Sequence, residues 1–304
     1  MRAACPTLLL LWFVALPFSR AHDVDERLDR LAHAIAERPG DVGLLLERAR
    51  FLRLEDEVAR AFSDADAAVR LGGGPLAQGE RGLCLERLGH RQRAEEDIDA
   101  ALAAMPARAD WLLARVRLRE ADGRSNEALR DLERAIQLGA DADAWLHRAR
   151  LVGELRGAQA RADLLREALP ATREAAPIAH ALAQALVEVG SWQELERFAS
   201  ERLLRRGAEE LTWRMFRADA LAGLGAMQEA KAERLRALAV SRERLASQRT
   251  AIALVDGARV LVSLGRWAEA RAMLLEALAA TPAWAEPSEM LHRLDASAKR
   301  KELR

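Results

Sequence analysis

The sequence predicts an all-α protein made of about seven stacked helical hairpins. The first observation is a pattern of 34 residues that recurs along the 304-residue chain and is clearest from Pro75 to Arg108. There, small residues alternate with larger apolar ones at helical spacing, and Gly89 separates two short helices. The second observation is the composition, which has no Tyr and little Pro and therefore favours helices over strands. We expect helix nearly throughout, arranged as repeats.

Glycines mark the turns between paired helices. Gly89, Gly123 and Gly157 follow one another at intervals of 34 residues. A glycine just past a helix can adopt the left-handed conformation that closes the helix. The interval from Gly225 to Gly265 is longer, at 40 residues, and predicts extended helices between these two turns.

The first residues differ in composition from the rest. Arg2 precedes an apolar run from Thr7 to Phe18, and Ser19 and Ala21 place small residues at positions −3 and −1 of a cleavage site. This pattern is typical of a secretory signal peptide, and the run is too short to span a bilayer as a helix. We therefore predict that residues 1–21 are a signal peptide, that the protein is exported, either periplasmic or secreted, and that no membrane span remains after cleavage.

The remaining chain is expected to form one array with a helix at each end. Residues 22–40 look like the second helix of a repeat whose first helix is missing, and such a helix can cap a stack. The repeats occupy residues 41–284. Residues 285–304 are expected to form a C-terminal capping helix with a charged tail. One hairpin cannot bury its apolar face alone, so the units must stack.

The charge balance excludes some partners. The 47 basic and 47 acidic residues cancel, and 45 basic against 47 acidic residues remain once Arg2 and Arg20 leave with the signal peptide. A field strong enough to bind nucleic acid or an anionic membrane is not expected.

No catalytic pattern is present in the sequence. The phosphate-binding loop, the nucleophile elbow and the paired-histidine zinc motif are missing, and the six histidines are scattered without ligand spacing. Cys84, the one cysteine left after cleavage, is expected to be a small buried apolar residue. We predict a protein that is not an enzyme and has no cofactor and no metal.

These repeats resemble the tetratricopeptide-repeat (TPR) family, and the signal peptide makes the chain similar to exported bacterial members. The resemblance covers about residues 24–284. The small position of the family's first helix matches Gly82, Ala183, Ala218 and Ala258, and its second helix matches Ala94, Ile98, Ala101 and Pro106, and again Ala270, Leu274, Ala277 and Pro282. The resemblance implies a right-handed α-solenoid whose concave face is lined by the first helix of each unit.

The resemblance also implies a binding site in that concave groove. The groove positions are Leu83 and Glu86, His180 and Gln184, Met215 and Asp219, and Val255 and Arg259. This largely apolar lining with isolated polar groups suits a protein or peptide partner. Arginine pairs at 48/50, 115/117 and 148/150 recur in three units. If Arg50, Arg117 and Arg150 face the groove, they form a strip for an anionic partner, and otherwise these arginines pair with acids on neighbouring helices.

The function that follows is a non-enzymatic scaffold or adaptor for a protein or peptide. One alternative is a cell-envelope or polysaccharide assembly factor, and another is an accessory subunit of an exported enzyme. Tryptophans 111, 145, 192, 213 and 267 recur near helix starts, where we expect them to pack between repeats. If they were platforms for sugar rings instead, a glycan partner would be possible.

Overall fold

The computed structural model describes residues 18–205, 207 and 209–302. These residues form sixteen α-helices and no β-strand, so the predicted all-α fold is confirmed. The chain divides into two compact units, residues 1–144 and 145–304. Most of the predicted signal peptide, residues 1–17, lies outside the described residues.

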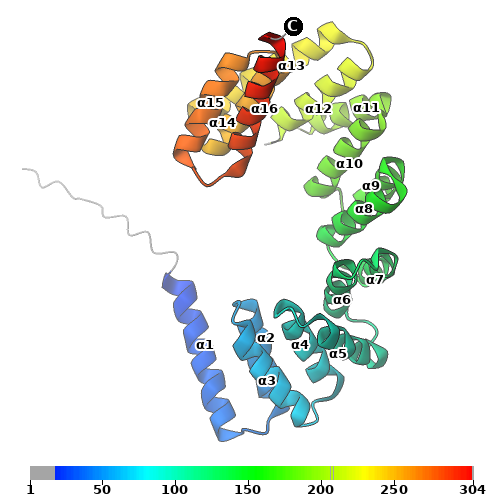
Figure 1. Ribbon diagram of the computed structural model, residues 1–304, viewed down its shortest axis with the longest axis vertical. Helices are drawn as coiled ribbons and strands as arrows, with labels where there is room; N and C mark the ends of the chain where they lie inside the picture. Colours follow the sequence, from blue (N-terminus) through cyan, green and yellow to red (C-terminus); the bar gives the residue numbers. More distant parts are fainter. Residues whose placement is uncertain (1–17, 206, 208, 303–304) are drawn as a thin grey trace, which may run out of the picture. The chain divides into compact units, whose positions relative to one another are not determined.

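The first unit is a stack of three hairpins preceded by one helix. The helices within each hairpin contact each other, and each hairpin contacts the next, as the helix pairs α2–α3, α4–α5 and α6–α7 in Figure 1 show. Helix α1 packs against α2. The bounds are α1 Phe18–Glu37, α2 Val42–Leu54, α3 Val58–Arg70, α4 Gly74–Arg87, α5 Arg91–Ala104, α6 Ala109–Ala121 and α7 Ser125–Gln137.

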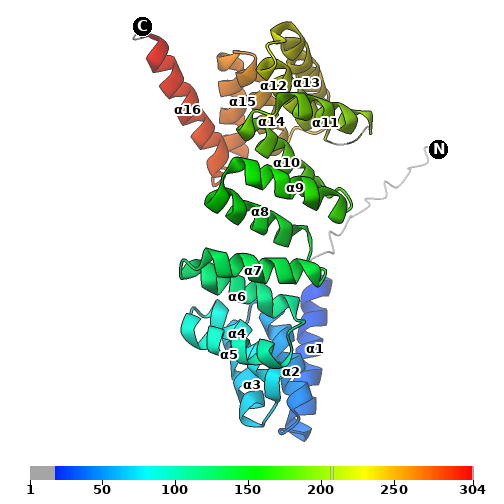
Figure 2. The same cartoon turned by 90° about the vertical axis from the view of Figure 1, so that its right-hand side faces the viewer.

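The second unit continues the alternation of helices. Successive helices from α9 to α16 contact one another, and the last two, α15 and α16, are drawn in orange and red in Figure 2. The bounds are α8 Ala142–Arg156, α9 Ala158–Ala171, α10 Ala176–Val189, α11 Trp192–Leu204, α12 Glu210–Gly223, α13 Met227–Ser247, α14 Ala251–Ser263, α15 Trp267–Ala280 and α16 Ala285–Glu302. Helix α8 begins just before the division between the units.

Small residues allow the helices to approach closely. Ala94 and Ala101 are completely buried, together with Ile98 between them. A Cβ atom on Gly82 would lie 2.7 Å from Cγ1 of Ile98, so α4 and α5 are already in contact there. At Gly79 the ring of Trp111 from α6 is closer still, and an added Cβ would lie 2.2 Å from its Cε2 atom. The small positions of the pattern are therefore the points where helices cross.

The turns follow the glycine spacing. Gly89 and Gly123 have φ angles of 80° and 74°, which side chains disfavour, and each ends the first helix of its hairpin. The longer interval from Gly225 to Gly265 is taken up by α13, which has 21 residues, whereas α14 has 13. The extra turns of α13 bury Ser241 and Leu245. A Cβ on Gly257 of α14 would lie 2.7 Å from the Ser241 hydroxyl, so the extended helix packs tightly on α14.

A repeated ion pair joins the two helices of each hairpin in the first unit. Arg48 binds Asp64, Arg81 binds Asp97, and Arg115 binds Asp131, each through two hydrogen bonds of 2.7 to 2.8 Å. The two partners are 16 residues apart in every case. For Arg48 and Arg115, the alternative that they pair with acids on neighbouring helices is confirmed.

Candidate functional site

The predicted groove residues of the first unit lie on three helices that follow one another along one side. Helix α4 contacts both α2 and α6. Arg50 is on α2, Leu83 and Glu86 are on α4, and Arg117 is on α6. The structure therefore brings these helices together, although it does not expose all four side chains. Leu83 is only 4% exposed and lies in the core with Trp111.

The two predicted groove arginines on these helices are paired with glutamates of α4. Arg117 donates two hydrogen bonds to Glu86, of 2.8 and 3.0 Å. Arg50 Nε lies 3.5 Å from Glu80, which also accepts a 2.6 Å hydrogen bond from Arg53. Because each arginine has a carboxylate beside it, the row does not form a strip of uncompensated positive charge. It forms a face of alternating charges.

An apolar cavity opens beside this face, and we name it the α2–α4 cavity. Its volume is about 510 Å³, and it lies between α1, α2 and α4. Leu54 on its wall is 74% exposed, an unusual position for a large apolar side chain. Charged residues surround the apolar ones, and the lining consists of Arg27, Gly43, Leu46, Glu47, Arg50, Phe51, Leu54 and Leu76.

In the second unit, α10 and α12 are in contact and carry four of the predicted residues. Gln184 is exposed, and Met215 is half-buried and packs against the core formed with α14. Asp219 faces Arg234 of α13 at 3.5 Å, and burial raises the pKa of this carboxyl group. The fourth residue, His180, stacks at a tilt on Trp213 with 5.1 Å between the ring centres.

The three other predicted residues of this unit have different environments. Val255 on α14 is 1% exposed and belongs to the core, so a partner would not contact it directly. Arg259 is half-exposed and hydrogen-bonds Asp256 and Glu286. Arg150 on α8 binds Glu154 at 2.7 Å and lines a cavity of about 420 Å³ between α8, α9 and α10.

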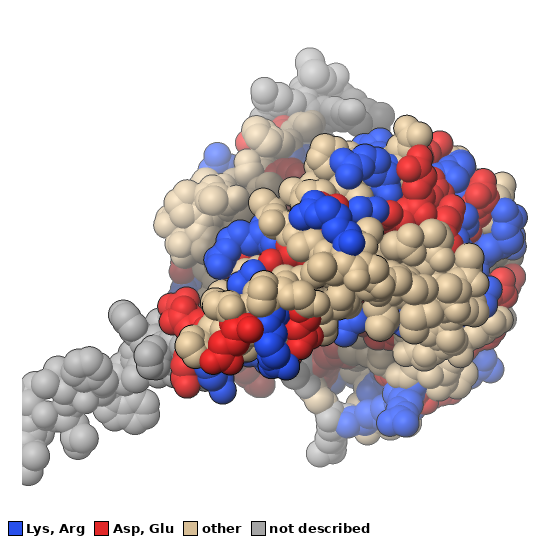
Figure 3. Space-filling view, turned by 90° about the horizontal axis from the view of Figure 1, so that it is seen from below, with Lys and Arg blue, Asp and Glu red and all other residues tan. Residues whose placement is uncertain are grey.

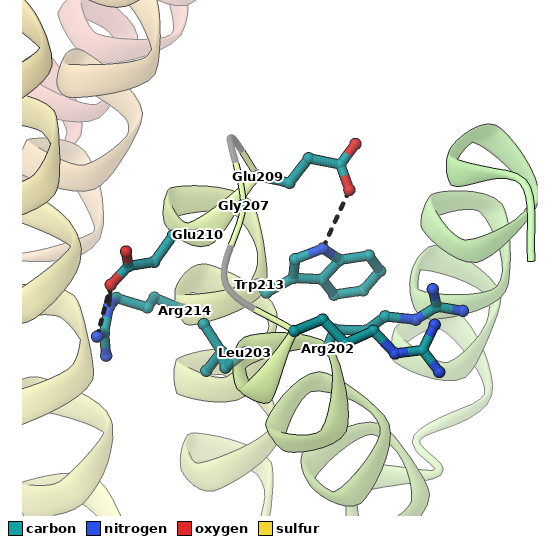
Figure 4. Close-up of a pocket in the computed structure, with 8 residues that line it drawn as sticks. Arg202, Leu203, Gly207, Glu209, Glu210, Trp213 and Arg214 are labelled. Carbon is teal, nitrogen blue, oxygen red and sulfur yellow. Dashed lines mark hydrogen bonds and ion pairs between the residues drawn. The ribbon is translucent and has the colours of Figure 1, made fainter.

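A larger cavity of the second unit lies between the end of α11 and the start of α12. We name it the Trp213 cavity. Its volume is about 630 Å³, and charged side chains surround Trp213 (Figure 4). The indole donates a 3.2 Å hydrogen bond to Glu209, and Arg214 donates one of 2.8 Å to Glu210. The arginines lining the cavity are Arg202, Arg205 and Arg214.

The tryptophans have more than one role. Trp111, Trp145 and Trp213 are buried, as packing between repeats requires. Trp192 is half-buried and covers Gly223, where an added Cβ would lie 2.2 Å from its ring. Trp267 is 40% exposed, so the expectation of buried packing does not hold for it.

The surface shows no segregation of charge on the face drawn in Figure 3, where basic and acidic side chains are interspersed. Cys84 is completely buried, and burial raises the pKa of its thiol to about 12. A thiol in that state is a poor nucleophile. Among the described residues no cluster of His, Cys, Asp or Glu could hold a metal ion. No helix in the described part of the chain is both long and apolar enough to cross a membrane.

Solved structures with the same arrangement of paired helices identify the fold. A tetratricopeptide repeat protein from Parabacteroides merdae superposes with a TM-score of 0.53, at 17% identity, over 83% of this chain and 98% of its own. The C-terminal part of a TPR-containing protein from Cytophaga hutchinsonii gives 0.57, at 14% identity, over 80% and 98%. Yeast Tom70 gives 0.52, at 13% identity, over 92% of this chain and 60% of its own.

The fold is therefore that of the tetratricopeptide-repeat proteins, as the repeat pattern predicts. No protein-family model matches the chain, and no curated protein sequence matches it either.

Sequence reasoning missed the Trp213 cavity and the exposed Leu54. The cavity is lined by residues from the end of α11 and the start of α12, and no sequence motif predicts a cavity at such a junction. A signal for the ion pairs was present, because Arg and Asp recur 16 residues apart at positions 48, 81 and 115.

Proposed function

We propose that this protein is a non-enzymatic scaffold that binds a protein or peptide partner along the first helices of its repeats. Stacked helical repeats commonly bind partners on the extended faces that successive helices form. The observation that carries the proposal is the α2–α4 cavity, where Leu54 is 74% exposed beside the half-buried Phe51 and Leu76. Exposed apolar groups with a polar rim are typical of interaction sites.

The chemistry of the cavity suits a peptide with mixed character. Arg27 donates a 3.2 Å hydrogen bond to Glu47, and its guanidinium lies 4.9 Å from the ring centre of Phe51. Arg50, which is on α2 with Glu47 and Phe51, has 44% of its side chain exposed. An apolar side chain of the partner would enter beside Leu54, while its polar groups would contact this charged rim.

Site-specific photo-crosslinking in cells tests the proposal. A photoreactive residue at position 54 is expected to capture one dominant protein. The photoreactive residue placed at position 71 serves as the matched control. Leu71 is also a large exposed apolar residue, at 50%, but it lies at the end of α3, the second helix of its hairpin. In a pull-down with the protein that lacks the photoreactive residue, the captured partner should be lost with Leu54→Asp and retained with Leu71→Asp. Equal capture from both positions, or no effect of Leu54→Asp on a folded protein, would remove this cavity as the binding site.

We further propose that the protein acts in an exported compartment, either periplasmic or secreted. The apolar run and the small residues at positions 19 and 21 support this, and the proposed cleavage would leave the buried Leu28 and Leu31 of α1 in the mature chain. N-terminal sequencing of the protein from fractionated cells should find His22 as the first residue. Recovery from the cytoplasm with residues 1–21 intact would contradict export.

A further inference from the structure

The Trp213 cavity is lined by a nearly buried arginine that makes one ion-pair contact and no hydrogen bond to a described residue. The side chain of Arg202 is only 10% exposed. Its ion-pair contact is with Glu174 at 3.4 Å, and Glu174 is shared with Arg205. No hydrogen bond joins the Arg202 guanidinium to another of the described residues. A buried cation normally has hydrogen-bonded carboxylates around it, because leaving water is costly for an ion.

The other charged groups of the cavity do have hydrogen bonds. Arg214 donates to Glu210 and also to Glu233, at 2.8 and 3.0 Å. Glu209 accepts from the indole of Trp213, and Arg205 donates to Glu174. Among the arginines that line the cavity, Arg202 is therefore the one whose guanidinium makes no hydrogen bond to another described residue. An anion would accept the hydrogen bonds that this guanidinium can donate.

The electrostatics of Arg202 differ from those of the structural arginines. Burial, together with the neighbouring charge of Arg205, lowers the pKa of Arg202. In contrast, hydrogen bonds to Asp64 and Asp97 raise the pKa values of Arg48 and Arg81. Hydrogen bonds to aspartate thus stabilise the charged form of those two arginines, whereas Arg202 has only the 3.4 Å ion-pair contact with Glu174 and the charges of Glu209 and Glu201 nearby.

Aromatic rings surround the same guanidinium. Its central carbon lies 4.9 Å from the ring centre of Phe198 and 5.7 Å from that of Trp213. The ring centres of Phe198 and Phe216 each lie 5.6 Å from the ring centre of Trp213, so these neighbours hold the indole in place. Figure 4 shows Trp213 between Glu209 and Arg202. A flat apolar group beside the charge would contact this aromatic wall.

We propose that the Trp213 cavity binds a carboxylate attached to a flat apolar group, with the carboxylate hydrogen-bonded to Arg202 and the apolar group against Trp213. A volume of about 630 Å³ accommodates a small organic acid or a short piece of peptide. The site is separate from the α2–α4 cavity, which belongs to the first unit, and adds a second ligand to the proposed function. The carboxylate could come from a free organic acid or from an acidic residue beside an aromatic one.

Nuclear magnetic resonance of the tryptophan indole N–H groups tests the proposal. The Trp213 resonance is assigned by its loss in Trp213→Phe. Two carboxylate probes distinguish the sources: 3-phenylpropionate represents a free acid, and acetyl-Phe-Asp-amide represents a peptide. We expect at least one of them to shift the Trp213 resonance saturably, and the tighter binder identifies the source. The neutral 3-phenylpropionamide should bind at least about tenfold more weakly than its acid, a difference of about 1.4 kcal/mol.

Matched variants then assign the contact to Arg202. Arg202→Gln should weaken carboxylate binding at least about tenfold, as loss of a charge-assisted hydrogen bond predicts. Arg242→Gln, an exposed position on α13, should leave it unchanged. The comparison of acid with amide uses the unaltered protein, so it holds even if Arg202→Gln does not fold. The proposal is overturned if neither carboxylate shifts Trp213 saturably, or if acid and amide bind equally.

Discussion

Arg81 on α4 and Asp97 on α5 form two parallel hydrogen bonds of 2.7 Å, and the remaining arm of the same guanidinium reaches a third helix. That arm donates a 3.0 Å hydrogen bond to Asp66 on α3. One side chain therefore joins the two helices of its own hairpin and also joins that hairpin to the preceding one. Arg115 repeats the arrangement with Asp131 and Asp99.

Removing one partner of this arrangement should destabilise the first unit. Arg81→Ala leaves the buried carboxylate of Asp97 without a partner, and we expect a loss of about 3 kcal/mol in the free energy of unfolding. The double replacement of Arg81 and Asp97 by Leu should recover much of that loss, because no charge is then stranded. Urea unfolding of the wild type and these variants measures both values. Equal stability of Arg81→Ala and the wild type would show that the pair is not structural.

Stability should fall below about pH 4.5 through carboxylates that are hydrogen-bonded to arginine. The hydrogen bond from Arg124 lowers the pKa of Glu95 from its ordinary value of 4.5. A lowered pKa means that the folded state favours the ionised form. The stabilisation from Glu95 is fully present above pH 4.5 and is lost as the pH falls through the lower pKa of the folded state.

Urea unfolding between pH 3 and pH 6 measures how the free energy of unfolding depends on pH. The variant Glu95→Gln should show a weaker dependence on pH than the wild type. Glu96→Gln, on the neighbouring exposed position, should keep the wild-type dependence. If all three proteins respond identically, Glu95 does not contribute to acid unfolding.

The crossing of α4 and α6 should not tolerate a methyl group at Gly79. An added Cβ would lie 2.2 Å from the ring of Trp111, which is itself 1% exposed and has no room to move. We expect Gly79→Ala to destabilise the protein by about 2 kcal/mol. Gly40→Ala is the control, because nothing lies within 4 Å of a Cβ at that position. Thermal unfolding compares the midpoint temperatures of the two variants. Equal midpoints would contradict the close approach of α4 to Trp111 at Gly79.

Cys84 should react with thiol reagents only when the protein opens. Its side chain is completely buried, and burial raises the pKa of the thiol to about 12, so little thiolate forms near pH 8. In a Cys5→Ser chain, where Cys84 is the single thiol, we expect very slow labelling by Ellman's reagent. The same chain in concentrated guanidinium should react completely. Rapid labelling of the folded protein would mean that Cys84 is accessible.

The repeat architecture could be predicted from local patterns. The spacing of Gly89, Gly123 and Gly157, and the small residues between them, indicated helices that pair in hairpins, because both signals reflect contacts close in sequence. The longer interval after Gly225 located the extended helix α13 in the same way. The placement of individual side chains was less predictable. Leu83 and Val255 occupy groove positions by the family pattern, yet both are buried in the core.

The sequence by itself determined the all-α class, the hairpin repeat, the turn glycines and the burial of Cys84. These features follow from helical periodicity and residue size, which act over a few neighbouring residues. Only the tertiary structure decided that Arg48 and Arg115, and not Arg50 and Arg117, bind an aspartate of their own hairpin. It also decided that Arg202 lies beside Phe198 and Trp213 and that Leu54 is exposed. Those outcomes depend on the rotation of each helix against its neighbours. A rotation of one residue, about 100°, exchanges a buried side chain for an exposed one.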